Sequence, residues 1–167
     1  MSYNLDVKKI TKDEWSLSNC KERAMYIISN YNKTEKQLRD KLKQSKKYSE
    51  KTIDETIKFL KKHNYINDRD FALRFVELYK GKYSKKVLNQ KLYLKGIDKK
   101  IIDEVLAESE DELDSRSLIR KTLLKKYPDY YIEKDDMDIK ESQKVFAYLF
   151  RKGFPYEDVE YVLRNDS

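Results

Sequence analysis

The residues that could carry out covalent chemistry are few and stand apart from one another. His63 is the single histidine and Cys20 the single cysteine. A hydrolytic triad would have to be built around His63, which lies at the end of an expected helix with no nucleophile motif nearby. We interpret His63 as a solvated helix cap and Cys20 as a buried or half-buried thiol. The sequence therefore predicts a protein that is not an enzyme.

Metal and nucleotide sites are not expected either. Asp135, Asp136, Asp138 and Glu141 could hold a hard cation, but this run lacks the glycine that an EF-hand loop needs at its sixth position. We interpret the run as a solvated surface loop, with an arginine-bearing protein partner as the alternative. The chain contains 3 glycines, and neither nucleotide-binding fingerprint occurs in it. No metal and no cofactor are therefore predicted.

Basic side chains are the functional groups in excess, since the formal net charge is +7. Lys and Arg outnumber Asp and Glu over residues 19–62 and 63–107, whereas the acids are in excess over 108–167. This gradient favours a polyanionic partner at one end and a protein partner at the other, although simple solvation of helices is the alternative. The candidate binding residues lie on or beside the expected helices: Arg23, Arg39, Lys43, Arg69, Arg74, Lys91, Lys95, Arg151 and Lys152.

The 14 tyrosines suggest stacking platforms, because aromatic rings among basic side chains bind single strands without sequence preference. Tyr83, Tyr93 and Tyr130 lie next to basic or loop positions and are the candidates for exposure. Tyr26, Tyr79 and Tyr148 lie in or beside apolar stripes, so we expect them in the core or at its boundary. Packing is the competing interpretation even for the first group.

Internal repeats define the elements that must position these side chains. Residues 84–106 and 141–163 share one pattern, in which a helix is followed by a turn and a second helix. The turns contain Gly96 and Gly153, each followed by an apolar residue. Glycine at this place allows the positive φ that ends a helix, and the next residue closes the turn by an apolar contact.

A third and weaker copy occupies residues 34–60, where Lys47 replaces the glycine and predicts a turn of different shape. N-cap residues are expected at Ser49 and Asp98, and at Asn67 or the residue after it. An additional helical segment precedes each pair, because apolar residues recur there at helical spacing. Those stripes are Ala24, Ile27, Ile28 and Tyr31; Phe71, Phe75, Val76 and Tyr79; and Ile119, Leu123 and Tyr127.

The chain is thus predicted to be all-α, with three tandem three-helix repeats that form a curved, elongated array. The expected divisions are an N-terminal arm or short strand at 1–18 and repeats at 19–66, 67–108 and 109–167. No stretch is long and apolar enough to span a bilayer or to act as a signal peptide, and one cysteine suits a reducing compartment. We therefore expect a monomeric, cytoplasmic protein.

Four segments carry a resemblance to a known family. They are NKTEKQLRDKL (32–42), YINDRDFA (65–72), Leu92 with KGI (95–97), and RKGF (151–154) followed by Glu157, Val159 and Leu163. Their order and spacing, from about Arg23 to the C-terminus, resemble those of RecX, the bacterial regulators of the RecA recombinase. The sequence departs from the family pattern at Lys47 and in its short N-terminal region.

The resemblance implies three-helix repeats that bind along the groove of the RecA filament on single-stranded DNA. It further implies that the protein limits filament growth and so lowers strand exchange and the co-protease activity of RecA. No catalytic residues come with the resemblance. Two other functions stay open on the residues alone: a DNA-binding helical protein that acts without a recombinase, and a helical adaptor between proteins.

Overall fold

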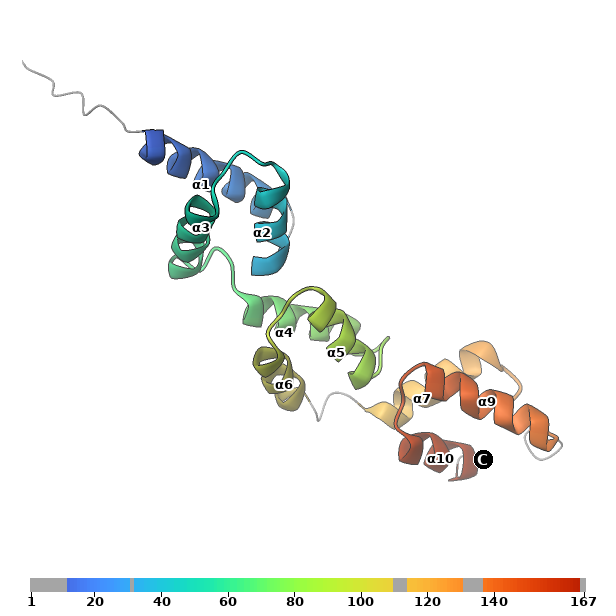
Figure 1. Cartoon of the computed structure of the whole chain (residues 1–167). Helices are drawn as coiled ribbons and strands as arrows, with labels where there is room; N and C mark the ends of the chain where they lie inside the picture. The colour runs from blue at the N-terminus through green and yellow to red at the C-terminus, as the bar shows by residue number, and fades with distance from the viewer. Residues whose placement is uncertain (1–11, 31, 110–113, 131–136, 166–167) are drawn as a thin grey trace, which may run out of the picture. The chain divides into compact units, whose positions relative to one another are not determined.

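The computed structural model describes residues 12–30, 32–109, 114–130 and 137–165, and within these ranges it contains helices and no strands. Figure 1 shows the pattern of three helices three times along the described chain. The helices are α1 (Lys12–Asn30), α2 (Glu35–Gln44), α3 (Glu50–Lys62), α4 (Asp68–Tyr79), α5 (Lys85–Leu94), α6 (Lys99–Glu108), α7 (Ser115–Lys126), α9 (Ile139–Arg151) and α10 (Tyr156–Asn165). The predicted all-α class with three tandem three-helix repeats is confirmed. No helix in these ranges combines the length and the apolar character needed to cross a bilayer.

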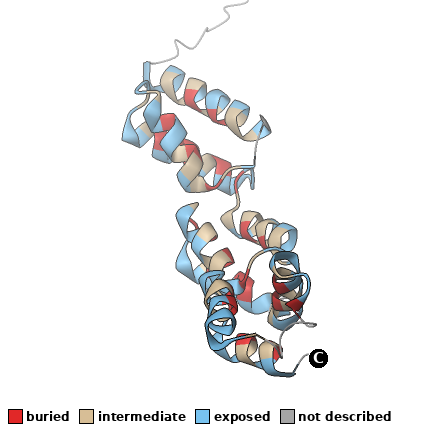
Figure 2. Cartoon of the chain, turned by 90° about the vertical axis from the view of Figure 1, so that its right-hand side faces the viewer, coloured by how far each residue is buried: buried red, intermediate tan, exposed pale blue. Residues whose placement is uncertain are grey.

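The chain divides into two compact units, residues 1–71 and 72–167, and α4 spans the division. The core of the first unit draws on α1, α2 and α3 and on Ile66, in the turn before α4. Its buried members are Cys20, Ala24, Leu38, Leu42, Ile53, Ile57, Leu60 and Ile66. Figure 2 shows buried positions on the inward faces of the helices and exposed positions on the outward faces, as expected of amphipathic helices.

Helix α1 begins earlier than the sequence suggested. It starts at Lys12, so residues 12–18, which we expected in an arm or short strand, are helical. Residues 1–11, on whose apolar pattern the strand alternative rested, lie outside the described part of the chain. Asp13 and Glu14 occupy the first turn of α1, where negative charge is favourable beside the positive end of the helix dipole.

The turn between α2 and α3 places a lysine where the other repeats have glycine. Lys46 follows the end of α2 with φ 56°, and Gly96 and Gly153 take φ values of 82° and 81° at the same place after α5 and α9. The residue that replaces glycine is therefore Lys46 rather than Lys47, and at this residue the turn keeps the shape of the other two. The difference from them is one extra residue before α3.

The second unit contains two repeats that contact each other directly. Ser84, the N-cap of α5, is 4% exposed; its hydroxyl accepts a hydrogen bond from the N–H of Val87 and donates one to the carbonyl of Lys152 at 3.0 Å. Gly153 comes next, and a Cβ atom placed there would lie 2.9 Å from the Ser84 hydroxyl oxygen. The turn between α9 and α10 is thus fixed against the start of α5.

Candidate nucleic-acid interface

Two of the predicted binding residues form ion pairs within the first unit. Arg39 pairs with Asp54 and with Glu35, whose carboxylate lies 3.3 Å from the guanidinium group. Lys43 lies 2.9 Å from the carboxylate of Glu50. The hydrogen bond to Asp54 is the main reason that the pKa of Arg39 is raised. These two side chains are therefore engaged by neighbouring acids, although the repeat as a whole keeps its excess of Lys and Arg.

Glu35 lies at the centre of a network that joins α2, α3 and the start of α4. Its carboxylate accepts a hydrogen bond from Lys61 at 2.8 Å, and its backbone N–H donates to Asp68 at 2.8 Å. Burial favours a higher pKa for Glu35, but the hydrogen bonds and charges of Lys61 and Arg39 outweigh it and hold the pKa below the ordinary value of 4.5. Burial, with the nearby charge of Glu35, raises the pKa of Asp68.

The remaining predicted arginines of the first two repeats are exposed. The guanidinium group of Arg23 lies 5.4 Å from the ring centroid of Tyr26 at the end of α1. Arg69 and Arg74 lie on α4, and the division between the units falls between them. These three residues are therefore accessible to a large partner, and their role in binding stays a prediction.

The tyrosines follow the expected pattern only in part. Tyr93 is 67% exposed, as predicted. Tyr130, which we expected at the surface, is 6% exposed and packs in the core of the third repeat, whereas Tyr26, expected near the core, is 62% exposed. Tyr83 and Tyr148 are half-buried, and both line a hollow of the second unit.

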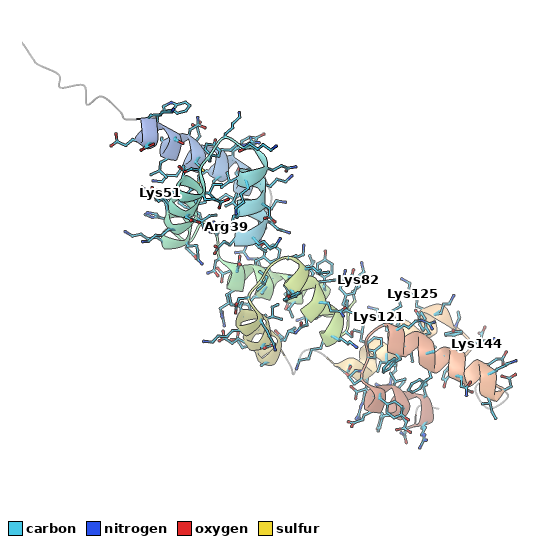
Figure 3. All side chains as sticks on the ribbon, in the orientation of Figure 1. Arg39, Lys51, Lys82, Lys121, Lys125 and Lys144 are labelled. Carbon is cyan, nitrogen blue, oxygen red and sulfur yellow. The ribbon has the colours of Figure 1, made fainter. Side chains whose placement is uncertain are left out.

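Basic side chains of the second unit line this same hollow, which has a volume of about 730 Å³. It lies where the turn between α4 and α5 meets α7 and the end of α9, and we call it the junction pocket. Figure 3 labels Lys82, Lys121 and Lys125 near this meeting point. The basic residues of the junction pocket are Lys82, Lys121, Lys125, Lys126, Arg151 and Lys152. None of the lining residues that the structure describes is acidic.

The junction-pocket cations differ from Arg39 and Lys43, because none of them forms an ion pair with a residue in the described ranges. Several of them instead lie beside aromatic rings. The ammonium group of Lys82 lies 5.3 Å from the ring centroid of Tyr83, and that of Lys91 approaches the same ring to 4.7 Å. Lys152 lies 5.4 Å from the ring of Tyr148. Lys91 thus adjoins the junction pocket, although it does not line it.

Sequence analysis predicted some of the basic residues of this pocket and did not predict the others. Arg151 and Lys152 were among the predicted binding residues, and the structure brings them together with cations from two other elements. The missed residues are Lys82, Lys121, Lys125 and Lys126. Summing charge over the third repeat concealed its three lysines among many acids, and Lys82 lies in a turn of the second repeat. The available signal was local: Lys121 and Lys125 are one helical turn apart, and both are exposed.

Lys95, the last of the predicted residues, is half-buried, and its ammonium group lies 5.5 Å from the ring of Phe75.

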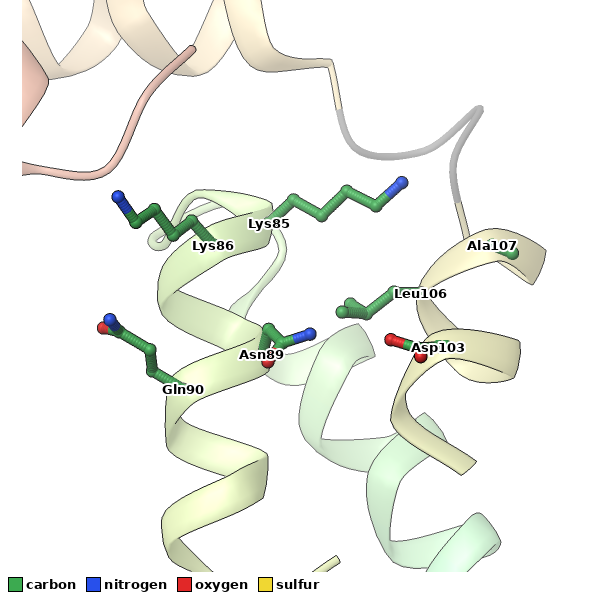
Figure 4. Close-up of a pocket in the computed structure, with 7 residues that line it drawn as sticks. All are labelled: Lys85, Lys86, Asn89, Gln90, Asp103, Leu106 and Ala107. Atoms are coloured by element: carbon green, nitrogen blue, oxygen red, sulfur yellow. The ribbon is translucent and has the colours of Figure 1, made fainter. Parts of the chain in front are cut away.

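Two other hollows contain charge of both signs. Figure 4 shows Asn89 of α5 facing Asp103 of α6 across a hollow that Lys85 also lines. A hollow of the first unit includes Glu22 beside Arg23. Neither hollow offers the uniform positive charge of the junction pocket.

The two residues with reactive side chains lie in ordinary structural positions. His63 is exposed and is the C-cap of α3, as predicted, with its ring centroid 4.5 Å from that of Phe59. Cys20 is fully buried, and burial raises the pKa of its thiol, which disfavours the reactive thiolate. In the part of the chain that the structure describes, no three His, Cys, Asp or Glu residues are grouped to hold a metal ion.

The acidic run that we predicted as a surface loop is partly described. Asp135 and Asp136 lie outside the described residues. Asp138 is exposed and is the N-cap of α9, where its carboxylate accepts a hydrogen bond from the N–H of Glu141 at 2.7 Å. Helix capping accounts for Asp138 without a bound cation.

Comparison with known proteins identifies the same repeats. Three family models match in succession, described as the first, second and third three-helix domains of RecX, at residues 20–60, 67–106 and 114–163. The regulatory protein RecX of Clostridium beijerinckii is 37% identical over 145 residues, which cover 87% of this chain and 67% of that protein. The regulatory protein RecX of Clostridium botulinum (strain Eklund 17B) is 32% identical over 164 residues, covering 98% and 76%.

Solved structures give the same result. The crystal structure of RecX from Lactobacillus salivarius matches with a TM-score of 0.72 and 26% identity, covering 89% of this chain and 95% of that one. A second match, described as a crystal structure of regulatory protein RecX, has a TM-score of 0.75 and 24% identity over 88% of this chain and 71% of that one. Family models, relatives and structures thus agree along most of the sequence, and the chain belongs to the RecX family of regulatory proteins.

Proposed function

We propose that this protein binds the RecA filament on single-stranded DNA and limits its growth, thereby lowering recombinase and co-protease activity. It acts as a monomeric, cytoplasmic regulator and not as an enzyme. The observation that carries the proposal is the match of three successive RecX domains along the chain. RecA is the partner that the resemblance of the sequence to this family implies.

The repeated architecture supports a partner that is itself regular. Each repeat presents a similar set of helices, so the chain offers several weak contact surfaces at fixed intervals along its sequence. Linked weak sites gain avidity only when the partner presents matching sites at a spacing that the linked repeats can span. A nucleoprotein filament has this property, and its DNA also provides the polyanion that the exposed basic residues favour.

The direct test measures RecA ATPase activity and filament assembly on single-stranded DNA while the full chain is titrated from substoichiometric amounts upwards. We expect inhibition well below one molecule per RecA, because a regulator that stops growth or lies in the groove affects many subunits. Circular dichroism confirms that the sample is folded. A folded protein without effect at equimolar concentration would contradict the proposal.

The predicted binding surface on α4 and α5 has its own test. The triple variant Arg69→Glu, Arg74→Glu and Lys95→Glu should weaken the inhibition of RecA at physiological salt, since it reverses three charges. The matched control reverses three exposed lysines at other places, Lys51→Glu, Lys99→Glu and Lys144→Glu. Equal inhibition by the two triple variants would show that this surface does not face the filament.

A DNA-binding protein that acts without RecA is the second candidate, and the junction pocket favours it. In that case binding to bare DNA should be tight and steeply salt-dependent, and RecA activity should respond only through competition for the strand. Under the leading proposal, binding to bare DNA is weaker than binding to the filament. Indifference to both partners would instead indicate an adaptor between proteins.

A further inference from the structure

We propose that the junction pocket binds consecutive phosphates of a single-stranded nucleic acid. The inference deepens the proposed function and rests on it for one point, that the strand is the DNA of the filament. The charge gradient along the sequence suggested that the acidic third repeat contacts protein. The inference instead assigns part of the third repeat to the nucleic acid. Three of the pocket lysines lie on α7 and two further cations at the end of α9, so the third repeat supplies most of the positive charge.

The charge of the pocket favours an external anion. Its cations have no ion pair among the described residues, whereas Arg39, Lys43 and Lys61 of the first unit are all paired with acids. Like charges gathered in one hollow repel each other, and the repulsion is relieved when anions bind between them. Phosphate groups suit such a site, because each carries a full negative charge and exposes oxygens to several lysines at once.

The start of α5 adds a second attraction for anions. Ser84 and Val87 line the pocket, so the N-terminal end of this helix lies at its edge. The first turn of α5 contains Lys85 and Lys86 and no acid. The helix dipole and the backbone N–H groups of that turn favour an anion, which an acidic side chain supplies in α2 and α3 but none supplies here.

Size and aromatic lining favour a nucleic acid over an acidic peptide. A volume of about 730 Å³ exceeds what one phosphate fills and suits several linked groups. Tyr83 and Tyr148 line the same hollow beside lysines. Half-buried rings next to a basic track are how proteins bind single strands without reading their sequence, since every base has a face that can stack. A polyglutamate peptide has no aromatic face that could stack on these rings.

The test measures the fluorescence anisotropy of a labelled oligothymidylate with the full chain and without RecA. The variant Lys121→Ala, Lys125→Ala and Arg151→Ala removes three exposed cations of the pocket, and alanine preserves helix propensity at each place. We expect its affinity to fall about tenfold or more, and the salt slope to decrease by about 1 for each phosphate that the variant no longer neutralises. The control is Lys51→Ala, Lys99→Ala and Lys144→Ala, which removes the same net charge outside the pocket.

The outcomes separate the inference from the proposed function. Equal loss of affinity in the two variants, or a labelled polyglutamate peptide that binds the pocket as tightly as the oligothymidylate, would overturn the inference. RecA inhibition by the wild-type chain without pocket-dependent oligonucleotide binding would leave the proposed function standing and the inference refuted. Pocket-dependent binding without any effect on RecA would support the inference and refute the proposed function.

Discussion

Gly153 shows how one residue can serve two structural needs. Its φ of 81° lies in the left-handed region, which side chains with a Cβ atom avoid, and the space beside it is closed by the hydroxyl of Ser84. Because the carbonyl of Lys152 accepts the hydrogen bond from Ser84, the same turn that ends α9 also joins the two repeats of the second unit.

We therefore expect Gly153→Ala to lower the free energy of unfolding of the second unit by about 1–3 kcal/mol, from backbone strain together with the short contact. Gly81→Ala is the matched control, since nothing lies within 4 Å of a Cβ atom placed there. Chemical denaturation of both variants measures the difference. Equal stability of the two would show that the turn relaxes without cost.

The positive φ angles of Gly96 and Gly153 were predictable from the sequence, because a glycine directly after a helix commonly adopts this conformation. The turn after α2 was harder to interpret. Lys46 takes the left-handed conformation there, and nothing in its own residue type indicates this. Only the position of the helix end, which depends on packing, identifies Lys46 as the residue concerned.

At the scale of helices, the starts were largely predictable because caps are local. Ser49 and Asp98 cap α3 and α6 as expected, and Asn67 accepts hydrogen bonds from the N–H groups of Arg69 and Asp70 at the start of α4. The start of α1 was missed, since the predicted arm extended to residue 18 and the helix begins with weak apolar periodicity. Packing within the first unit, more than local signals, stabilises such a helix.

The network around Glu35 predicts a pH dependence for the first unit. A carboxyl group whose pKa is lowered in the folded state contributes stability above its ordinary pKa of 4.5 and loses it as the pH falls through the lowered value. Asp68, with its raised pKa, acts in the opposite sense. We expect Glu35→Gln to cost about 1 kcal/mol at neutral pH, because two charge-assisted hydrogen bonds weaken.

The difference between wild type and Glu35→Gln should shrink as the pH falls below 4.5. Denaturation curves recorded from neutral to acidic pH measure it. Asp40→Asn is the control, because Asp40 pairs with Lys36 at the open surface, where both side chains are 57% exposed. A constant difference between Glu35→Gln and wild type at every pH would contradict the role assigned to the charge of Glu35.

At the scale of the whole molecule, the sequence predicted the repeats and misjudged where charge gathers. The repeats follow from apolar spacing, which each segment carries within itself. The junction pocket instead combines Lys82, Lys121 and Arg151, which are far apart in the sequence and belong to three different elements. Net charge along the chain averages over such clusters, so only the folded arrangement separates ion-paired cations such as Arg39 and Lys43 from the unpaired cations of the junction pocket.

The division into two compact units predicts that they unfold separately. Trp15, the single tryptophan, lies in α1 and reports on the first unit. Leu149→Ala, which removes a fully buried side chain of α9, should destabilise the second unit by about 2–5 kcal/mol and leave the tryptophan transition in place. Leu42→Ala should do the reverse. Coincident shifts of fluorescence and circular dichroism in both variants would show that the chain unfolds as one.

The unpaired cations of the junction pocket should also make the stability of the second unit depend on whether an anion is bound there. Their mutual repulsion opposes folding most at low ionic strength, so added neutral salt should lessen this unfavourable contribution in the second unit. A bound strand should raise the melting temperature of this unit, because a ligand that binds only the folded state stabilises that state by mass action. Without a bound strand, the second unit should therefore have a lower melting temperature than in the complex. Its melting temperature then indicates whether the pocket is filled.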